Sequence, residues 1–341
     1  MKAAYFDAHG SPDVLAVGEL PDPEPGPGDV IVAVEAAALN HLDLWVRRGL
    51  PGLDVALPHV GGSDLAGTIS EVGREVEGWK VGDRVTANPG LWCGTCEWCL
   101  RGEHSLCERY HILGEHVAGA LAERVRVPSG NLLRLPDGFP ARRAAAAPLV
   151  FQTAWRALVG RARVRVGETV LVTGASGGVS TAAIQIAKRL EARVIAVTSG
   201  PYVEAVRALG ADHVIDRETE DLSTAVRELT ERRGVDVALD SVGEKTWKST
   251  VGSLARNGRL ITYGATTGAE GCQDVRLVFW KQLQIIGSTM ASHAEFVEVM
   301  GLVFDGSLEP VVDVVWPLER VREAHERLES GEAFGKIVLT P

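Results

Sequence analysis

The feature that most restricts the fold is a regular alternation of short apolar runs with helical stretches over residues 169–290. The runs TVLVT, RVIAVT, HVID, VDVALD, RLITYG and LQIIGS are rich in β-branched residues, and helices are expected over residues 182–190 and 202–209. Such alternation is typical of β-α-β units, in which a helix connects two parallel strands. The sequence therefore predicts an α/β fold with a doubly wound parallel sheet in this part of the chain.

A glycine-rich turn, in VLVTGASGGVS, joins the first of these strands to its helix. The backbone N–H groups of such a turn, with the N-terminus of the following helix, can bind the pyrophosphate of a dinucleotide. The pattern itself is weak, because only the central glycine of G-x-G-x-x-G is present, but its place after a strand is the one required. The alternative is an ordinary strand-to-helix turn. The candidate cofactor-binding residues are Gly174, Ser176, Gly177, Gly178 and Val179.

The end of the second strand bears on the choice between NAD and NADP, because an acidic residue there binds the ribose 2′-hydroxyl of NAD. This strand ends in AVTSG, which places Ser199 at that position. No Arg or Lys stands beside Ser199 to bind a 2′-phosphate. The sequence leaves NAD and NADP open, with a slight preference for NADP or for the use of both.

The N-terminal third differs in character, being rich in β-branched residues, glycine and proline. A turn-rich connector over residues 21–29 precedes the strand-like run VIVAVEAAAL, and TISEV and DRVTA are further strand candidates. These signals predict an all-β unit with hairpin-like connections. Helical composition begins at residues 141–159, and the tail carries a predicted helix over residues 318–330 and a final strand, KIVLT.

Four of the five cysteines have the spacing C-x2-C-x2-C-x7-C, and the fifth, Cys272, is isolated. Four thiolates on short loops suit tetrahedral zinc, with Zn–S distances of about 2.3 Å. A ferredoxin-type iron–sulfur run would have three residues before its last cysteine and a proline after it, whereas Glu108 follows here. Four cysteines leave no open position on the metal, which predicts one structural zinc. Its ligands are Cys93, Cys96, Cys99 and Cys107.

Charge and hydropathy restrict the partners. Lys and Arg number 35 against 45 Asp and Glu, giving a net charge of −10, which is unlike a protein that binds nucleic acid or an anionic membrane. The N-terminus lacks the features of a signal peptide, and no apolar run approaches the roughly 20 residues that span a bilayer. We therefore expect a cytoplasmic protein with a small-molecule substrate, and neither nucleic acid nor membrane as a partner.

The chain resembles the medium-chain dehydrogenase/reductase superfamily over essentially its whole length. The resemblance is carried by LNHLDLWVRRG, LPHVGGSDLAGTISEVGREVEGWKVGDRV, the four-cysteine lobe, GASGGVS, LDSVG and GKIVL. It implies a GroES-like β-rich substrate domain over residues 1–136, with the zinc lobe at 93–107, and a Rossmann dinucleotide-binding domain over residues 137–300. A tail over residues 301–341 would return to the first domain, and edges of the Rossmann sheet would join a homodimer or homotetramer.

Two branches of that superfamily compete. The zinc alcohol dehydrogenases place a catalytic zinc ligand where this chain has Asn40, and their Gly-His-Glu corresponds here to residues 62–64, which read Gly-Ser-Asp. The position of their third ligand, near Leu149, has neither Cys nor His, and Leu42 replaces their proton-relay hydroxyl. Asn40 with Asp43 resembles the quinone oxidoreductase-like branch instead. The resemblance thus implies zinc for folding and no zinc for chemistry.

The resemblance also implies roles for individual residues. Around the substrate, Asn40 would orient a carbonyl or the nicotinamide, and the alternative is a buried amide that bridges backbone groups. Asp43 would be an orienting residue or a structural hydrogen-bond acceptor rather than a general acid. Trp45 would line the substrate pocket or belong to the core, and His59 would line the pocket, donate a proton or be a loop histidine. His41 and Lys336 would reach the cofactor, and Thr153 would lie near the nicotinamide. The loops after two later strands supply the remaining cofactor candidates, Ser241, Val242, Gly264, Ala265 and Thr266.

These features favour an NAD(P)(H)-dependent oxidoreductase that transfers hydride between nicotinamide and a small carbonyl, enone or quinone in a cleft between its domains, with a structural zinc only. One alternative is a zinc alcohol or aldehyde dehydrogenase with an irregular site that uses Asp64 and His59. A second is a dinucleotide-binding protein without enzymatic activity. Zinc content separates the first two, and turnover on a substrate panel separates both from the third.

Overall fold

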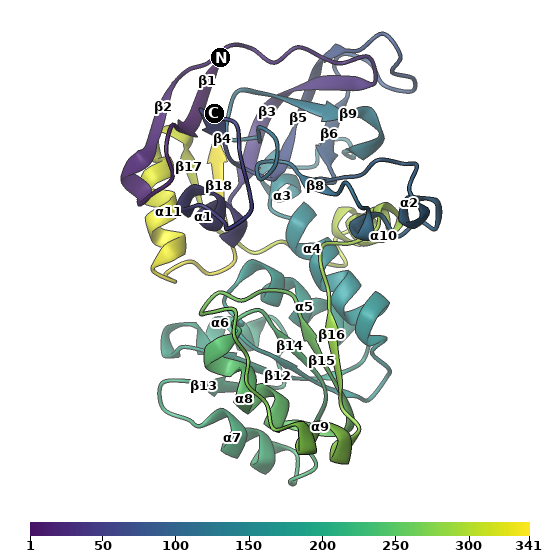
Figure 1. Ribbon diagram of the computed structural model, residues 1–341, viewed down its shortest axis with the longest axis vertical. Coiled ribbons are helices and arrows are strands. Elements are labelled where there is room, and N and C mark those ends of the chain that lie inside the picture. The colour runs from purple at the N-terminus through teal and green to yellow at the C-terminus, as the bar shows by residue number, and fades with distance from the viewer. The chain divides into compact units, whose positions relative to one another are not determined.

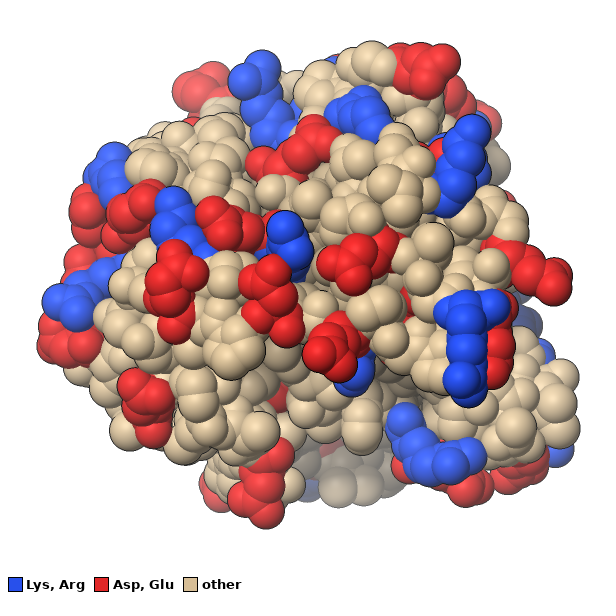
Figure 2. Space-filling view, turned by 90° about the horizontal axis from the view of Figure 1, so that it is seen from above, with Lys and Arg blue, Asp and Glu red and all other residues tan.

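The computed structural model describes residues 1–341, which divide into two units (Figure 1). The first consists of residues 1–152 and 291–341, and the second is the continuous segment 153–290. None of the helices combines the length and the apolar composition that a bilayer crossing requires. On the face shown in Figure 2, acidic and basic side chains are interspersed, so the net charge of −10 is not gathered in one area there.

The second unit has the predicted doubly wound sheet of parallel strands, in the order β13-β12-β11-β14-β15-β16. Its apolar core includes Leu171, Ile195 and Leu260, all fully buried. The strands are β11 (Thr169–Val172), β12 (Arg193–Thr198), β13 (His213–Asp216), β14 (Val235–Asp240), β15 (Leu254–Thr262) and β16 (Gln284–Gly287). The helices are α5 (Gly178–Arg189), α6 (Val203–Ala208), α7 (Leu222–Leu229), α8 (Glu244–Gly252) and α9 (Val275–Lys281).

The first unit is β-rich, as expected. Its largest sheet has seven strands in the order β10-β6-β5-β3-β18-β17, with β9 also paired to β3. Its strands are β1 (Lys2–Phe6), β2 (Leu15–Glu19), β3 (Asp29–Ala38), β4 (His59–Val60), β5 (Asp64–Val72), β6 (Arg84–Ala87), β7 (Gly90–Leu91), β8 (His111–Ile112), β9 (Arg124–Pro128), β10 (Leu132–Arg134), β17 (Val312–Pro317) and β18 (Lys336–Thr340). Its helices are α1 (His41–Arg48), α2 (Glu97–Leu100), α3 (Ala141–Ala145), α10 (His293–Phe304) and α11 (Val321–Glu329).

The N-terminal third is not all-β, and this corrects the expectation from its composition. Residues 41–48 form α1, which follows β3 directly. The Asp43 carboxylate accepts a hydrogen bond from the Asn40 backbone N–H at 2.7 Å and so stabilises the first turn. The apolar face of α1, with Leu44 and Val46, packs into the core of the first unit.

The unit boundaries differ from the expected divisions at residues 136 and 300. The helix α3 contacts β3 and β5, which places residues 137–152 with the first unit. The helix α10 also belongs there, because the Phe304 ring packs against that of Phe139 with centroids 5.1 Å apart. The boundary falls within α4 (Pro148–Trp155), a helix that continues as a π-helix over Arg156–Ala162. At the other end of the chain, β18 lies in the first unit's sheet, paired with both β3 and β17.

Candidate active site

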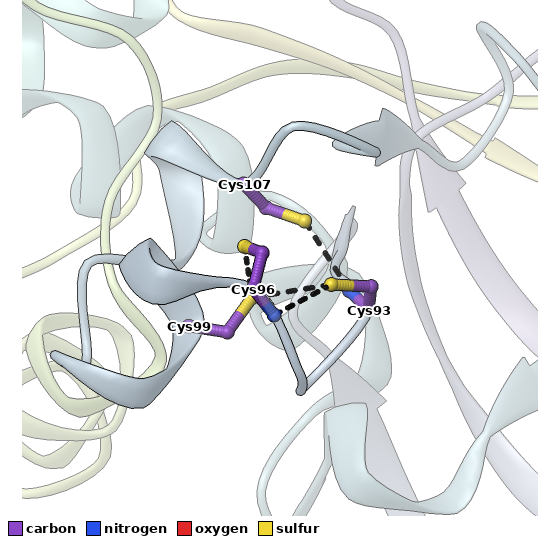
Figure 3. A group of neighbouring side chains, drawn as sticks. All are labelled: Cys93, Cys96, Cys99 and Cys107. Atoms are coloured by element: carbon purple, nitrogen blue, oxygen red, sulfur yellow. Dashed lines mark hydrogen bonds between the residues drawn. The ribbon is translucent and has the colours of Figure 1, made fainter.

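The four predicted zinc ligands converge in the first unit (Figure 3). All four sulfur atoms lie within 4.8 Å of one another, with Cys93 Sγ 3.9 Å and Cys96 Sγ 3.5 Å from Cys99 Sγ. Four sulfurs bound at about 2.3 Å around a tetrahedral zinc would be roughly 3.8 Å apart, so the arrangement fits the ion. No other group of three or more His, Cys, Asp or Glu residues has comparable geometry.

The electrostatics of this lobe also suit a cation. Hydrogen bonds from the Thr95 backbone N–H and hydroxyl lower the pKa of Cys93 to about 5. Burial among the other sulfurs raises the pKa of Cys99 to about 12. Adjacent thiols cannot all ionise unless a positive charge lies between them, and a bound zinc ion supplies that charge.

A second polar cluster, formed by Asn40, Asp64 and Lys336, lies deep in the same unit. The Lys336 Nζ is 2.9 Å from Asp64 Oδ2 and also donates a hydrogen bond to Asn40 Oδ1. Asn40 Nδ2 donates to the same Asp64 oxygen at 2.9 Å. Asp64 is completely buried, and Asn40 and Lys336 are 6% and 3% exposed. A buried carboxylate, ammonium and amide thus neutralise and bind one another, as buried charges must.

Strand pairing in the central sheet assembles this cluster. Asp64 begins β5 and faces Ala38 across the ladder with β3, two residues before Asn40. Lys336 begins β18, in which Val338 faces Ala38 from the other side of β3. The second oxygen of Asp64 accepts a hydrogen bond from the Leu149 backbone N–H at 2.8 Å. Three segments far apart in the sequence therefore meet at one end of β3.

Asp43 stabilises the backbone on which the cluster is built. Its two carboxylate oxygens accept hydrogen bonds of 2.7 Å each, one from the Asn40 N–H and one from the Gly62 N–H. Burial raises the pKa of Asp43 to about 6, although both hydrogen bonds and the Lys336 charge oppose the shift. These contacts make Asp43 a residue that positions Asn40 and the segment leading to Asp64.

The far end of α1 is fixed as well. Arg47, fully buried, forms an ion pair with Glu329 of α11 at 2.8 Å and contacts His325 Nδ1 at 3.2 Å. Burial, with the Arg47 charge, lowers the pKa of His325 to about 3 and keeps that ring neutral. The helix that carries Asn40 at its start is therefore held at both ends.

Two buried polar side chains near the cluster have no hydrogen-bond partner. The Ser63 hydroxyl, next to Asp64, is completely buried and unpaired. Gln152 is also completely buried, and neither atom of its amide has a partner. It lies about one turn after Leu149 on α4. A polar residue within the apolar run PLVFQTAW is the one feature of the sequence that could have identified Gln152 as a candidate. Unpaired buried polar groups are costly, and a bound polar ligand is one way to satisfy them.

The other substrate-side candidates lie around α1 and β4. Trp45 is half-buried on α1, and so is His41, whose pKa is lowered by burial and by the Lys336 charge. His59 is 3% exposed, and its Nε2 lies 3.0 Å from the Gly114 carbonyl oxygen. The backbone of Ala56 also forms a hydrogen bond with the His59 side chain, and its ring packs on Phe6 with centroids 5.4 Å apart. These contacts favour a packed structural histidine over a proton donor.

In the second unit, the cofactor candidates gather at the carboxyl edge of the sheet. Gly174 has a positive φ of 58°, and Gly177 precedes the first residue of α5. A Cβ on Gly177 would meet only the Gly174 carbonyl oxygen, at 3.3 Å, so the backbone there is open to a ligand. The Thr198 hydroxyl at the end of β12 is buried and unpaired. An open glycine turn before a helix N-terminus fits a dinucleotide pyrophosphate.

The loops after β14 and β15 adjoin this turn. The Asp240 carboxylate accepts hydrogen bonds from the Val242 and Gly243 N–H groups and shapes the first loop. The Thr266 hydroxyl donates to the Ser241 carbonyl oxygen at 3.0 Å and ties the two loops together. The remaining candidates of this unit are Ser176, Gly178 and Val179 at the turn, Ser199 after β12, Gly264 and Ala265 after β15, and Thr153 on α4. Lys336, by contrast, lies in the first unit against Asp64.

Comparisons with known proteins agree with this architecture. Residues 26–137 match the family model of the alcohol dehydrogenase GroES-like domain, and residues 209–339 match that of the zinc-binding dehydrogenases. The chain is 35% identical to an NAD-dependent alcohol dehydrogenase of Saccharolobus solfataricus, with both chains covered completely. It is 33% identical to an acryloyl-coenzyme A reductase of Sulfurisphaera tokodaii, with 95% of each covered. A crystal structure of an NAD-dependent alcohol dehydrogenase superposes with a TM-score of 0.96 at 46% identity, covering 100% of both chains.

Proposed function

The chain belongs to the medium-chain dehydrogenase/reductase superfamily, and on that premise we propose that it reduces activated carbonyls, enones or quinones without a catalytic metal. It is an NAD(P)-dependent oxidoreductase, and its cysteine lobe suits one structural zinc. The substrate class and the absence of catalytic zinc are the proposal.

The contact between Lys336 and Asp64 is the observation that carries it. A catalytic zinc needs three protein ligands, and the positions that would provide them hold Asn40, Ser63 and Leu149. Asp64 is the one plausible ligand that remains. Asp64 already holds an ammonium group 2.9 Å from one oxygen and a backbone N–H on the other. A divalent cation bound to Asp64 would lie beside the Lys336 charge, which repels it.

The chemistry then depends on groups that polarise the substrate. When bound, the nicotinamide supplies the hydride. An ammonium group has three N–H donors. Lys336 donates one hydrogen bond to Asn40 and one to Asp64, which leaves its third N–H for a substrate oxygen. Enones, unsaturated thioesters and quinones carry their own electron sink, so one positioned hydrogen bond can suffice. A simple alcohol lacks that sink and needs its hydroxyl pKa lowered before hydride leaves. The similarity to an acryloyl-coenzyme A reductase supports the unsaturated class.

For the cofactor, we propose that NAD is preferred over NADP. A Cβ on Gly200, next to Ser199, would lie 3.2 Å from Asp216 Oδ2 and 3.6 Å from Glu218 Oε2. These carboxylates, at the end of the neighbouring strand β13 and just after it, would repel a 2′-phosphate placed near Ser199. Asp216→Ser should therefore improve the KM for NADPH relative to NADH by roughly tenfold, about 1.4 kcal/mol. An unchanged ratio would remove Asp216 from the assignment.

Oxidation of alcohols is the second candidate, and the 46% identity to an NAD-dependent alcohol dehydrogenase favours it. A panel of enones, unsaturated thioesters, quinones and primary alcohols, assayed with both dinucleotides, tests the two. We expect turnover of the activated substrates, slow turnover of alcohols and one zinc per chain by metal analysis. Two zinc ions per chain, or alcohol oxidation that a chelator abolishes while the cysteine lobe stays loaded, would overturn the proposal.

We also propose that the second unit's sheet edge joins two copies of the chain. The strand β16 has one unpaired edge, and nearby Phe279 and Trp280 are 63% and 69% exposed. Free strand edges beside exposed apolar side chains tend to be covered by a partner. Light scattering should report a dimer or larger for the wild type, and Ile285→Lys on β16 should shift it toward monomer; a monomeric wild type would refute this assembly.

A further inference from the structure

A largely buried carboxyl group in the first unit, that of Glu115, has no role in the chemistry described so far. It lies in the loop between β8 and β9, and its side chain is 13% exposed. Its polar contact is with His116 Nδ1, at 3.5 Å. Buried carboxyl groups normally have several hydrogen-bond partners, so this one is unusually free to react.

The loop that carries Glu115 is fixed against the segment leading to Asp64. A Cβ on Gly114 would lie 2.6 Å from the backbone of Gly62, and one on Gly119 would lie 2.3 Å from the Gly62 carbonyl oxygen. The backbones therefore touch at positions that only glycine allows. Because Gly62 N–H donates to Asp43, Glu115 comes close enough to Asp43 for their negative charges to repel.

This environment favours the protonated form of Glu115, so that much of it still carries the proton near neutral pH. Burial raises the pKa of Glu115 to about 7, and the negative charge of Asp43 contributes to the shift. Lys336 and Asp64, which also act on Asp43, neutralise each other in their ion pair. A carboxylic acid with a pKa near the working pH is suited to general acid catalysis.

His116 completes a route for the proton. Its Nδ1 accepts a hydrogen bond from the Ile112 N–H at 3.2 Å, so this nitrogen presents a lone pair. Burial and the neighbouring His111, whose ring stacks on it at 4.8 Å, lower the pKa of His116 and keep it neutral. A negatively charged Glu115 carboxylate 3.5 Å from this unprotonated nitrogen would be repelled, so the contact favours the protonated form of Glu115. The His116 side chain is 29% exposed and connects the carboxyl group to solvent.

We propose that Glu115 is the proton donor in the reduction of an enone or unsaturated thioester, an assignment that rests on the proposed function. After the β-carbon has received hydride, the electron pair of the former C=C bond lies on the α-carbon and the carbonyl oxygen. The Glu115 O–H bond breaks, a C–H bond forms at the α-carbon, and the carboxylate regains a proton from solvent past His116. Charge and atoms balance, with the reduced dinucleotide as the reductant.

Asp43 is less suited to this role than Glu115. Both of its oxygens accept backbone N–H hydrogen bonds, and it is 3% exposed. The two N–H groups stabilise the carboxylate, so they oppose the protonated form that a proton donor must have. Glu115 has no such contacts.

Glu115→Gln tests the assignment, because the amide has the same shape and cannot donate a proton to carbon. We expect kcat for an enone to fall about a hundredfold, while the dissociation constant for NADH stays unchanged. The wild-type rate should fall as the pH rises above about 7, and this limb should vanish in the variant. In D2O the wild type should label one face of the α-carbon, whereas the variant should label both faces.

Stability gives a readout independent of turnover. Because folding raises the pKa of Glu115, the folded state binds the proton more tightly, and stability falls as the pH rises from about 4.5 through 7. Glu115→Gln should make the melting temperature fall less steeply in that range, and most clearly between pH 6 and 7, above the raised pKa of Asp43. Glu123→Gln is the matched control, because this carboxylate, just before β9, is exposed and accepts a hydrogen bond from the Lys2 N–H. This variant should leave the rate and the label unchanged.

The outcomes separate the two proposals. A wild type that reduces none of the enones, thioesters or quinones contradicts the proposed function itself. A wild type that reduces enones, with a Glu115→Gln variant of equal rate, equal pH profile and single-face labelling, contradicts the role of Glu115 alone. If the variant does not fold, Glu115→Asp, which keeps the acid on a shorter side chain, should retain single-face labelling at a reduced rate; labelling of both faces would overturn the assignment.

Discussion

The cysteine lobe and the Asn40–Asp64–Lys336 cluster hold polar groups in opposite ways. In the lobe, four sulfurs lie within 4.8 Å of one another and need a positive charge from outside the chain. In the cluster, the chain supplies its own positive charge, since the Lys336 ammonium lies against the Asp64 carboxylate. The lobe therefore fits a metal ion, whereas the carboxylate of the cluster already has a cationic partner from the chain. This difference is what the proposed function requires, with a metal ion stabilising the lobe and a side chain of the chain itself acting in the cluster.

The largest effect is expected in the lobe. Cys96→Ala removes one of the four ligands. Because zinc binding and lobe folding are coupled, the variant should lose stoichiometric zinc, and its free energy of unfolding should fall by several kcal/mol, part of the roughly 10 kcal/mol that a structural zinc site contributes. Metal analysis and thermal unfolding measure both quantities. Cys272→Ser, a change at an exposed cysteine outside the lobe, should keep its zinc. Full zinc in Cys96→Ala would disprove the ligand set.

The cluster should respond to loss of its own cation. Lys336→Met leaves the Asp64 carboxylate buried without its positive partner, with the hydrogen bonds from Asn40 and Leu149 still in place. The loss should cost about 3–5 kcal/mol in free energy of unfolding without changing the zinc content. The double variant Lys336→Met/Asp64→Asn removes both charges and should recover much of that stability. If the double variant is no more stable than the single one, the ion pair is not what holds this region.

Asn40→Ala should affect catalysis more than stability. The amide orients Lys336 and Asp64, so its loss should lower kcat/KM on an enone by roughly ten- to a hundredfold, or about 1.4–2.7 kcal/mol. Zinc content should stay at the wild-type value. A variant with unchanged kcat/KM would leave Asn40 as a structural amide only.

The smallest effect is expected at Ser63. Its buried hydroxyl has no partner, so Ser63→Ala should change the free energy of unfolding by less than about 1 kcal/mol, in the stabilising direction. If the hydroxyl contacts substrate, KM should rise severalfold with little change in kcat. A loss of stability instead would show that Ser63 is hydrogen-bonded in the folded protein.

Local pattern was enough to predict most of the fold. The alternation after residue 169 predicts the six parallel strands, because buried strands are short apolar runs between turn residues. The helix α1 was missed, because LNHLDLWVRR follows a long strand and its helical start depends on the contact between Asp43 and the Asn40 backbone. The predicted boundaries at residues 136 and 300 differ from those of the two units, because the true boundaries depend on contacts of α3 and α10 that no local sequence pattern reveals.

The site residues also fall into those that a local sequence pattern predicts and those that depend on distant contacts. The cysteine spacing predicted its cluster because all four ligands lie within one short segment. Lys336 and Asp64 are 272 positions apart, so their ion pair follows from strand pairing rather than from either neighbourhood. Sequence alone directed Lys336 toward the cofactor, and it gave no reason to single out Gln152 or Glu115. Gln152 stands out because its buried amide has no hydrogen-bond partner, and Glu115 because its largely buried carboxyl group has one polar contact, with His116.

The position of β18 has a consequence for synthesis on the ribosome. This strand lies between β3 and β17, inside the sheet that begins with the N-terminal segments. When residues 1–152 have emerged, β3 has one neighbour missing and Asp64 has no ammonium group beside it. The continuous segment 153–290 can fold while the first unit waits. A nascent chain interrupted before Lys336 would keep β3 with an unpaired edge and Asp64 without its ammonium partner. An unpaired strand edge can pair with other chains, and an incompletely folded chain is a substrate for chaperones and proteases.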